Sequence, residues 1–229
     1  MKKLFKLLFL IFIILSVFFI YIKTKDSKYT ILSLGDNLSL GIDSYGIKGP
    51  SYIDFYKNYI LKKKETVIKN DQYSRKDLTI NALLQELKEN NNLKKDLSSA
   101  NILILTVGYN DLIYKINLNE NINSDILKKE VQEIQKDYLN LLKEIRKYYK
   151  NKIVVIGYFA SNKTDYYINT GIKELNKTLQ SAKNITYIDT YDLLKPKRKY
   201  FSNKNSYYPN LQGYLRISKK IIIKTILRN

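Results

Sequence analysis

The sequence predicts a three-layer α/β/α domain with a central parallel sheet, and two patterns support this. From residue 29 onward, short apolar runs alternate with longer segments of helical apolar spacing, as in strands joined through helices. The runs at residues 102–107 and 153–158 are almost entirely apolar, which is typical of strands buried on both faces. A sheet buried on both faces needs helices on each side, hence three layers.

The expected elements follow one another in regular order along the chain. Strands are predicted at residues 29–34, 65–69, 102–107, 153–158 and 185–189. Helices are predicted where apolar residues recur every three or four positions, at residues 51–62, 77–88, 124–149, 164–179 and 211–227. Helical segments between consecutive strands favour crossover connections, and therefore parallel pairing.

Residues 1–28 are expected to form a membrane segment and tether, leaving residues 29–229 as one domain. Residues 4–22 are mostly apolar, close to the roughly 20 residues that a helix needs to cross a bilayer. A cleaved signal peptide is the alternative, but no Ala or Gly follows the run to mark a cleavage site. Lys2, Lys3 and Lys6 favour a cytoplasmic N-terminus. We therefore expect a single-pass protein of the cell membrane whose domain lies on the extracytoplasmic side.

Composition limits the partners and the chemistry. The formal net charge is +19, which suits an anionic partner such as a lipid or an envelope glycan polymer. The lysines are spread along the chain and no nucleic-acid-binding motif accompanies them, so no nucleic acid is expected. The chain has neither cysteine nor histidine, which argues against disulfides, thiol catalysis and transition-metal sites. No cofactor or metal is expected.

Three motifs in the domain carry polar side chains. They are Ile31–Ser39 (ILSLGDNLS), Thr106–Asp111 (TVGYND) and Asn205–Tyr214 (NSYYPNLQGY). In order and spacing they resemble the SGNH, or GDSL-type, esterase/lipase family from residue 29 to the C-terminus. In that family the first motif reads Gly-Asp-Ser-Leu-Ser, the second Gly-x-Asn-Asp and the third Asp-x-x-His-Pro-Asn. The resemblance implies an SGNH-hydrolase, flavodoxin-like fold and an ancestry in ester hydrolysis.

All three positions of the family's catalytic triad are changed in this chain. Asn37 stands at the nucleophilic serine, Asn205 at the aspartate and Tyr208 at the histidine. An amide nitrogen has a delocalised lone pair and does not attack a carbonyl as a serine oxygen does. A tyrosine, with an ordinary pKa of about 10, is a poor general base at neutral pH. We therefore expect that hydrolysis has been lost.

Part of the family's oxyanion hole is retained. The resemblance makes Asn110, after Gly108, the oxyanion asparagine, and the backbone N–H of Asn37 is still available. Asp77 is the best match for a further glycine of the family's oxyanion hole. Segments that follow parallel strands reach one rim of the sheet, so Asn37, Asp77, Gly108 and Asn110 are candidate ligand-binding residues there.

Structural roles compete with this interpretation at several positions. Gly35 and Gly108 suit tight turns after strands, and Asp36 and Asp111 suit helix capping or binding of loop amides. Nothing in the spacing supports Asp36 and Asp111 as a catalytic carboxylate pair.

Two serines in the first motif and the abundant tyrosines are further candidates for a role at the rim. Ser39 and Ser33 are expected to point away from the rim. The chain has 21 tyrosines and no tryptophan, and several tyrosines fall near predicted rim loops. Tyrosines there suit contact with a sugar or acylated glycan, although tyrosine is common throughout this chain.

Three functional hypotheses remain open. The first is a membrane-anchored, catalytically inactive protein that binds a ligand or partner at the cell envelope, such as an acylated or anionic glycan or lipid. The second is an active GDSL-type esterase on lipid or acylated-glycan esters that uses other residues. The third is an interaction protein without a ligand site. The sequence does not predict an oligomeric state.

Overall fold

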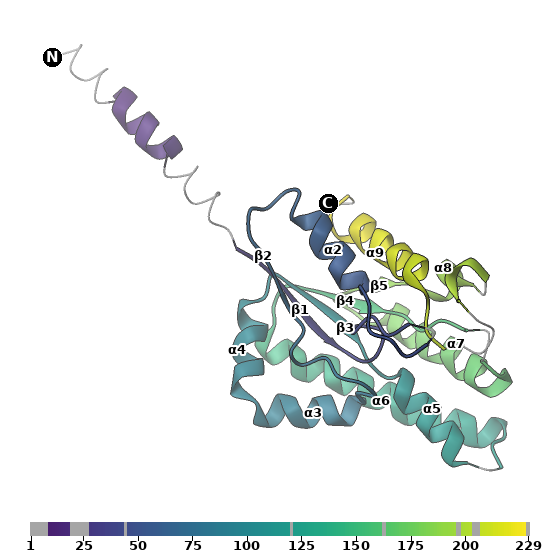
Figure 1. The fold of residues 1–229 in the computed structure, drawn as a ribbon. Coiled ribbons are helices and arrows are strands. Elements are labelled where there is room, and N and C mark those ends of the chain that lie inside the picture. Colours follow the sequence, from purple (N-terminus) through teal and green to yellow (C-terminus); the bar gives the residue numbers. More distant parts are fainter. Residues whose placement is uncertain are drawn as a thin grey trace.

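The domain has a five-stranded parallel sheet between two layers of helices (Figure 1). The computed structural model describes residues 9–18, 28–43, 45–119, 121–161, 164–195, 198–202 and 207–227. The strands are β1 (Tyr29–Gly35), β2 (Val67–Asn70), β3 (Ile102–Thr106), β4 (Lys152–Ile156) and β5 (Ile185–Ile188), in the order β2-β1-β3-β4-β5. All four pairings are parallel, which confirms the predicted three-layer architecture.

The helices divide between the two faces of the sheet. One layer is built by α2 (Tyr52–Ile60) and α9 (Leu211–Thr225). The opposite layer is built by α3 (Ile80–Glu89), α4 (Asn91–Ser99), α5 (Tyr109–Leu118), α6 (Ser124–Tyr148) and α7 (Tyr166–Ser181). A short α8 (Tyr191–Leu194) and a 3-10 turn (Arg198–Tyr200) connect β5 to α9.

Successive side chains along each strand point to opposite faces of the sheet, and this divides the hydrophobic core in two. In β1, Ile31 packs with the α2 and α9 layer, while Leu32 and Leu34 pack with the α3 to α7 layer. In β4, Val154 and Ile153 separate in the same way. Both faces of the central strands are therefore covered, which explains why their sequences are apolar without alternation.

The predicted strands and long helices are present with small shifts at their ends. The helix predicted from residue 77 begins at Ile80, because Thr79 accepts a hydrogen bond from the Ala82 N–H and so caps it. Helices α4, α5 and α8 were not predicted. Helix α4 has a polar composition with few apolar positions, and Asn90 caps it directly after α3 ends.

About half of the predicted membrane segment, residues 4–22, lies outside the described residues. Residues 9–18 are helical and their apolar side chains are mostly exposed. Within the described part of the chain, no helix has both the length and the apolar character to cross a bilayer. The membrane anchor therefore stays a prediction.

Candidate active site

Three segments that are distant in the sequence meet at the carboxyl end of the sheet. The turn after β1 supplies Asn37, the loop between β2 and α3 supplies Asp77, and the segment before α9 supplies Tyr208. The Asn37 Nδ2 donates to Asp77 Oδ1 at 3.0 Å and to the Tyr208 hydroxyl at 2.5 Å. The Asp77 backbone N–H donates to Asn37 Oδ1 at 3.1 Å. Two of the triad-equivalent positions and the oxyanion-glycine position are thus in direct contact, while Asn205 lies outside the described residues.

The Asn37 amide is engaged at both ends. Both amide hydrogens have an acceptor and the amide oxygen has a donor, and only 6% of the residue is exposed. We call these three side chains, Asn37, Asp77 and Tyr208, the amide lock. At the position where the family places its nucleophile, the lock forms a closed hydrogen-bonded contact.

Asp77 adopts a left-handed backbone conformation, with φ of 54°. Glycine adopts this region without strain, whereas other residues rarely do. The conformation therefore fits the match between Asp77 and a glycine of the family. It also directs the Asp77 N–H towards the Asn37 side chain.

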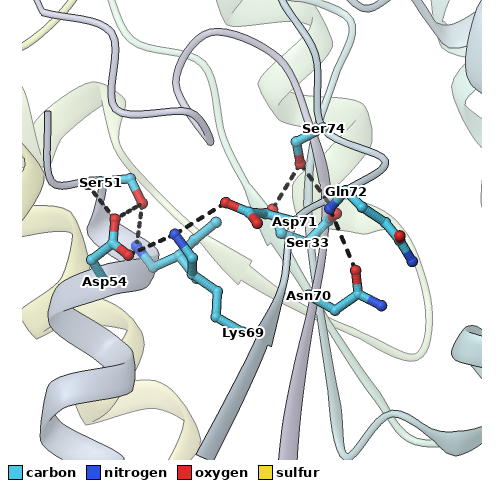
Figure 2. A network of polar contacts seen from close by, with 9 residues as sticks. Ser33, Ser51, Asp54, Lys69, Asn70, Asp71, Gln72 and Ser74 are labelled. Atoms are coloured by element: carbon cyan, nitrogen blue, oxygen red, sulfur yellow. Dashed lines mark hydrogen bonds and ion pairs between the residues drawn. The ribbon is translucent and has the colours of Figure 1, made fainter. Parts of the chain in front are cut away.

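The loop carrying Asp77 is fixed to the sheet by a polar network (Figure 2). The Ser74 hydroxyl donates to the Ser33 carbonyl at 3.1 Å, and Lys69 bridges Asp54 at 2.7 Å and Asp71 at 3.0 Å. The loop backbone also returns to β1, where the Arg75 N–H donates to the Gly35 carbonyl. These contacts place residue 77 opposite the end of β1.

The second motif lies beside the lock. Gly108 has φ of 103°, and a Cβ there would come within 2.3 Å of the Tyr158 hydroxyl. The Asn110 Nδ2 donates to the Leu78 carbonyl at 3.3 Å, one residue beyond Asp77. The Asp111 carboxylate accepts the Ile80 N–H at 3.2 Å, at the start of α3. Gly108 and Asp111 therefore have the structural roles considered above, and Asn110 borders the amide lock.

Burial controls the acidity of the site. It raises the pKa of Asp36 from its ordinary value of 3.8 to about 7, although the Leu38 N–H donates to that carboxylate at 3.0 Å. Burial likewise raises the pKa of Asp111 to about 6. Burial also raises the pKa of Tyr208, outweighing the hydrogen bond from Asn37. The raised pKa keeps the Tyr208 hydroxyl protonated at neutral pH, a state that does not suit a general base.

The serines considered as substitute nucleophiles have other partners. The Ser39 hydroxyl contacts the Tyr52 hydroxyl at 2.9 Å, and the Ser33 hydroxyl contacts that of Ser74 at 3.1 Å. Ser51 does contact a carboxylate, that of Asp54 at 3.0 Å. That pair is the capping box of α2, however, and Ser51 is fully buried (Figure 2). None of these three serines has the arrangement of an activated nucleophile at the rim.

Aromatic side chains line up beside the second motif. The Tyr109 ring stacks on Tyr158 and on Phe159, each at 6.4 Å between centroids, and Phe159 contacts Phe201 at 6.0 Å. Tyr109, Tyr158 and Phe159 lie at or after the ends of predicted strands and were expected near the rim, whereas Phe201, which follows the 3-10 turn, was not predicted there. Tyr158 is buried and its hydroxyl donates to the Val107 carbonyl at 2.7 Å, so it supports the turn from within.

The parallel three-layer fold and the meeting of these motifs at the strand ends define an SGNH-type domain. The chain belongs to the GDSL-like lipase/acylhydrolase family, whose sequence model matches residues 31–221. It is similar to the spore germination lipase LipC of Bacillus licheniformis, with 24% identity over 204 residues, covering 85% of this chain and 94% of that protein.

Solved structures share this fold at low identity. The lipase Lip_vut3 from a goat rumen metagenome superposes with a TM-score of 0.73 and 20% identity, covering 86% of this chain and 98% of that one. The acetylxylan esterase Axe2 of Geobacillus stearothermophilus superposes with a TM-score of 0.62 and 15% identity, covering 88% and 95%. These likenesses establish the architecture of the domain.

Proposed function

We propose that this chain is a catalytically inactive member of the GDSL family that binds a ligand or partner at the cell envelope, held to the membrane by its N-terminal segment. The observation that carries the proposal is the amide lock. Asparagine stands where the nucleophile belongs, and its hydrogen-bonding groups are bound by Asp77 and Tyr208.

The lock opposes ester hydrolysis in two ways. It provides neither an activated nucleophile nor a base, because the chain has no histidine and Tyr208 stays protonated. It also occupies an oxyanion donor, since the Asp77 N–H already donates to the Asn37 amide oxygen. A substrate carbonyl would have to displace that oxygen. Loss of a triad alone lowers turnover by several orders of magnitude in serine hydrolases.

The proposed ligand is an acylated or anionic envelope glycan or lipid. Relatives in this fold carry the names lipase and acetylxylan esterase, so their substrates are acyl esters of lipids or glycans. The net charge of +19 suits an anionic ligand, whereas the aromatic row beside the site is largely buried, with Phe159 only 7% exposed.

An active esterase is the second candidate, because the chain belongs to an acylhydrolase family and retains Asn110 next to the lock. The two candidates differ in one measurement, which is turnover of short p-nitrophenyl esters by the natural chain. Clear turnover that disappears in Asn110→Ala would contradict our proposal.

Restoration of the triad provides the positive experiment. The variant Asn37→Ser, Asn205→Asp and Tyr208→His is expected to hydrolyse the ester that the natural chain leaves intact. Adding Asn110→Ala to that variant should lower its turnover by about 100-fold, the usual effect of removing one oxyanion donor. Asn37→Ser alone is the matched control and should stay at background, because it lacks the base.

Membrane attachment has its own test. The full chain is expected to remain in the membrane fraction after a wash at high salt, while a chain beginning at residue 28 should be released by it. Recovery of the full chain in the soluble fraction would contradict the anchor and leave the proposal about the amide lock unaffected.

A further inference from the structure

Basic side chains gather at the amino end of the sheet, opposite the candidate site. The described segments that lead into the strands are residues 28, 61–66, 100–101, 149–152 and 182–184. Within these segments Glu65 is the single acidic residue. The lysines among them are Lys28, Lys62, Lys63, Lys64, Lys150, Lys152 and Lys183. We call this surface the amino-end face.

Among the described residues at the opposite end of the sheet, acidic and basic side chains are similar in number. The described segments that directly follow the strands contain the acids Asp36, Asp43, Asp71, Asp77, Asp165 and Asp189. Lys48, Arg75 and Lys76 in these segments, with Lys195, Arg198 and Lys199 beyond α8, bring basic residues to a similar number. Among the described segments at the two ends of the sheet, the excess of basic over acidic residues therefore lies at the amino end.

Stabilisation of helix ends does not explain the amino-end lysines. Cations in the last turn of a helix interact favourably with its dipole, and Lys57, Arg146, Lys147 and Lys224 occupy such positions. Those residues are not part of the amino-end face, whose members lie just before a strand or, for Lys152, at its first residue. Lys62, Lys63 and Lys64 are all exposed, in a turn whose backbone N–H groups donate to the last carbonyls of α2.

The amino-end face also has features that suit a lipid surface. Leu61, beside the three lysines, is 42% exposed, and Leu227, at the end of α9, is 59% exposed. A hollow of about 660 Å³ lies at the same end, lined in part by Arg146, Lys150 and Lys152. Exposed leucines between lysines can enter the interface of a bilayer while the ammonium groups meet phosphates.

We propose that the amino-end face docks on an anionic phospholipid bilayer. The chain enters β1 at residue 28, so the apolar N-terminal segment joins the domain at this very end. A bilayer that holds that segment would lie next to the lysines, where each contributes to attraction by anionic headgroups. The inference rests on the proposed anchoring of the N-terminal segment.

Docking in this way orients the candidate site. The strands run from the amino-end face to the amide lock, and seven residues of β1 span roughly 20 Å. The lock and Tyr109 would then face away from the membrane. The ligand of that site is accordingly a molecule of the envelope beyond the bilayer, an acylated or anionic glycan, and not a lipid of the same membrane.

Vesicle flotation of the chain beginning at residue 28 tests the docking surface without the anchor. We expect that chain to fold without the N-terminal segment, because its core starts at Ile31 and this domain matches the solved structures over 98% and 95% of their length. We expect flotation with phosphatidylcholine vesicles that contain phosphatidylglycerol and none with phosphatidylcholine alone. Added salt should reverse the binding.

Two charge-reversal variants locate the surface. Lys62, Lys63 and Lys64→Glu is expected to weaken partitioning by on the order of 100-fold. The matched control, Lys48, Lys76 and Lys195→Glu, makes the same change of net charge at the carboxyl end and should keep most of the binding. Circular dichroism of both variants verifies that they are folded.

Several results would overturn the docking surface: equal flotation with neutral vesicles, no flotation with either kind, or equal loss in both variants. Binding to soluble poly(glycerol phosphate) without binding to vesicles would also overturn it, in favour of a polymer partner. Failure of the anchor is a separate outcome, because the fractionation of the full chain measures it independently.

Discussion

The two ends of the parallel sheet use their polar residues in opposite ways. At the carboxyl end, Asn37, Asp77 and Tyr208 are bound to one another, and Asp36 is buried. At the amino end, Lys62 and its neighbours are exposed around a surface with few acids. The first end is maintained by internal contacts that other molecules would have to displace. The second presents exposed lysines to solvent, so substitutions at the two ends should have different kinds of effect.

The largest effect on stability is expected at the carboxyl end, from Gly108→Ala. The new Cβ would lie 2.3 Å from the Tyr158 hydroxyl and at φ of 103°. Backbone strain, overpacking and loss of the hydrogen bond from Tyr158 to Val107 should together lower the free energy of unfolding by about 4 kcal/mol. Urea denaturation of the chain from residue 28 measures this value.

Gly46→Ala is the matched control for that substitution. Gly46 has φ of 78°, but no atom lies within 4 Å of its added Cβ. Only the backbone strain remains, and we expect a loss of about 1 kcal/mol. Equal losses in the two variants would show that the packing against Tyr158 has little importance.

The next effect is a pH dependence that originates at Asp36. Burial raises its pKa from 3.8 to about 7, so the folded chain keeps a proton that the unfolded chain releases. Stability should therefore fall as the pH rises from about 4 to about 7, and Asp111 acts in the same direction up to about 6. The full difference at Asp36 corresponds to roughly 4 kcal/mol as an upper bound.

Asp36→Asn should remove most of this dependence. The asparagine oxygen can still accept the Leu38 N–H, while the variant has no carboxyl group to titrate. Denaturation at about pH 5 and about pH 8 should then give free energies of unfolding that differ less than in the natural chain. If the free energies of unfolding at the two pH values still differed as in the natural chain, a group other than Asp36 would cause the pH dependence.

A smaller effect is expected from the amide lock. Asn37→Ala removes the acceptor of the Asp77 N–H and the amide that donates to the Tyr208 hydroxyl, which should lower the free energy of unfolding by about 1–3 kcal/mol. Asp77→Gly loses one hydrogen bond but relieves the backbone at φ of 54°, so we expect a change of about 0.5 kcal/mol or less. A larger loss from Asp77→Gly than from Asn37→Ala would contradict this account of the lock.

The smallest effect on stability is expected at the amino end. Lys62, Lys63 and Lys64→Glu changes exposed side chains, and each substitution should alter the free energy of unfolding by about 0.5 kcal/mol or less. Chemical denaturation should therefore give nearly the same curve as the natural chain. A clear destabilisation would indicate that these lysines stabilise the fold, and the contrast between the two ends would be lost.

Much of the fold could be predicted because segments that are buried in the structure have an apolar sequence. The uninterrupted apolar runs at β3 and β4 exist because helices cover both faces of those strands. Helix α4 was missed because Leu93 and Leu97 are its only buried positions within an otherwise polar segment. Helix α5 was missed because it begins inside the second motif, and Leu112 and Ile116 are its only buried positions.

The candidate site was only partly predictable. The family motifs identified Asn37, Asp77 and Tyr208 as positions, but not that they bind one another. That contact depends on the left-handed backbone of Asp77 and on the network that fixes its loop, and neither leaves a sequence signal of its own. The amino-end face was also missed, since its lysines look evenly spread until the parallel sheet brings the loops together.

The engaged Asn37 amide has a practical consequence for detection. Fluorophosphonate probes label serine hydrolases by forming a bond to the nucleophilic oxygen while the phosphoryl oxygen rests among the oxyanion donors. Here an amide stands at the point of attack, and its own oxygen already rests against the Asp77 N–H. Activity-based surveys of a cell that makes this protein should therefore leave it untagged, and its abundance will have to be followed by antibody or mass spectrometry.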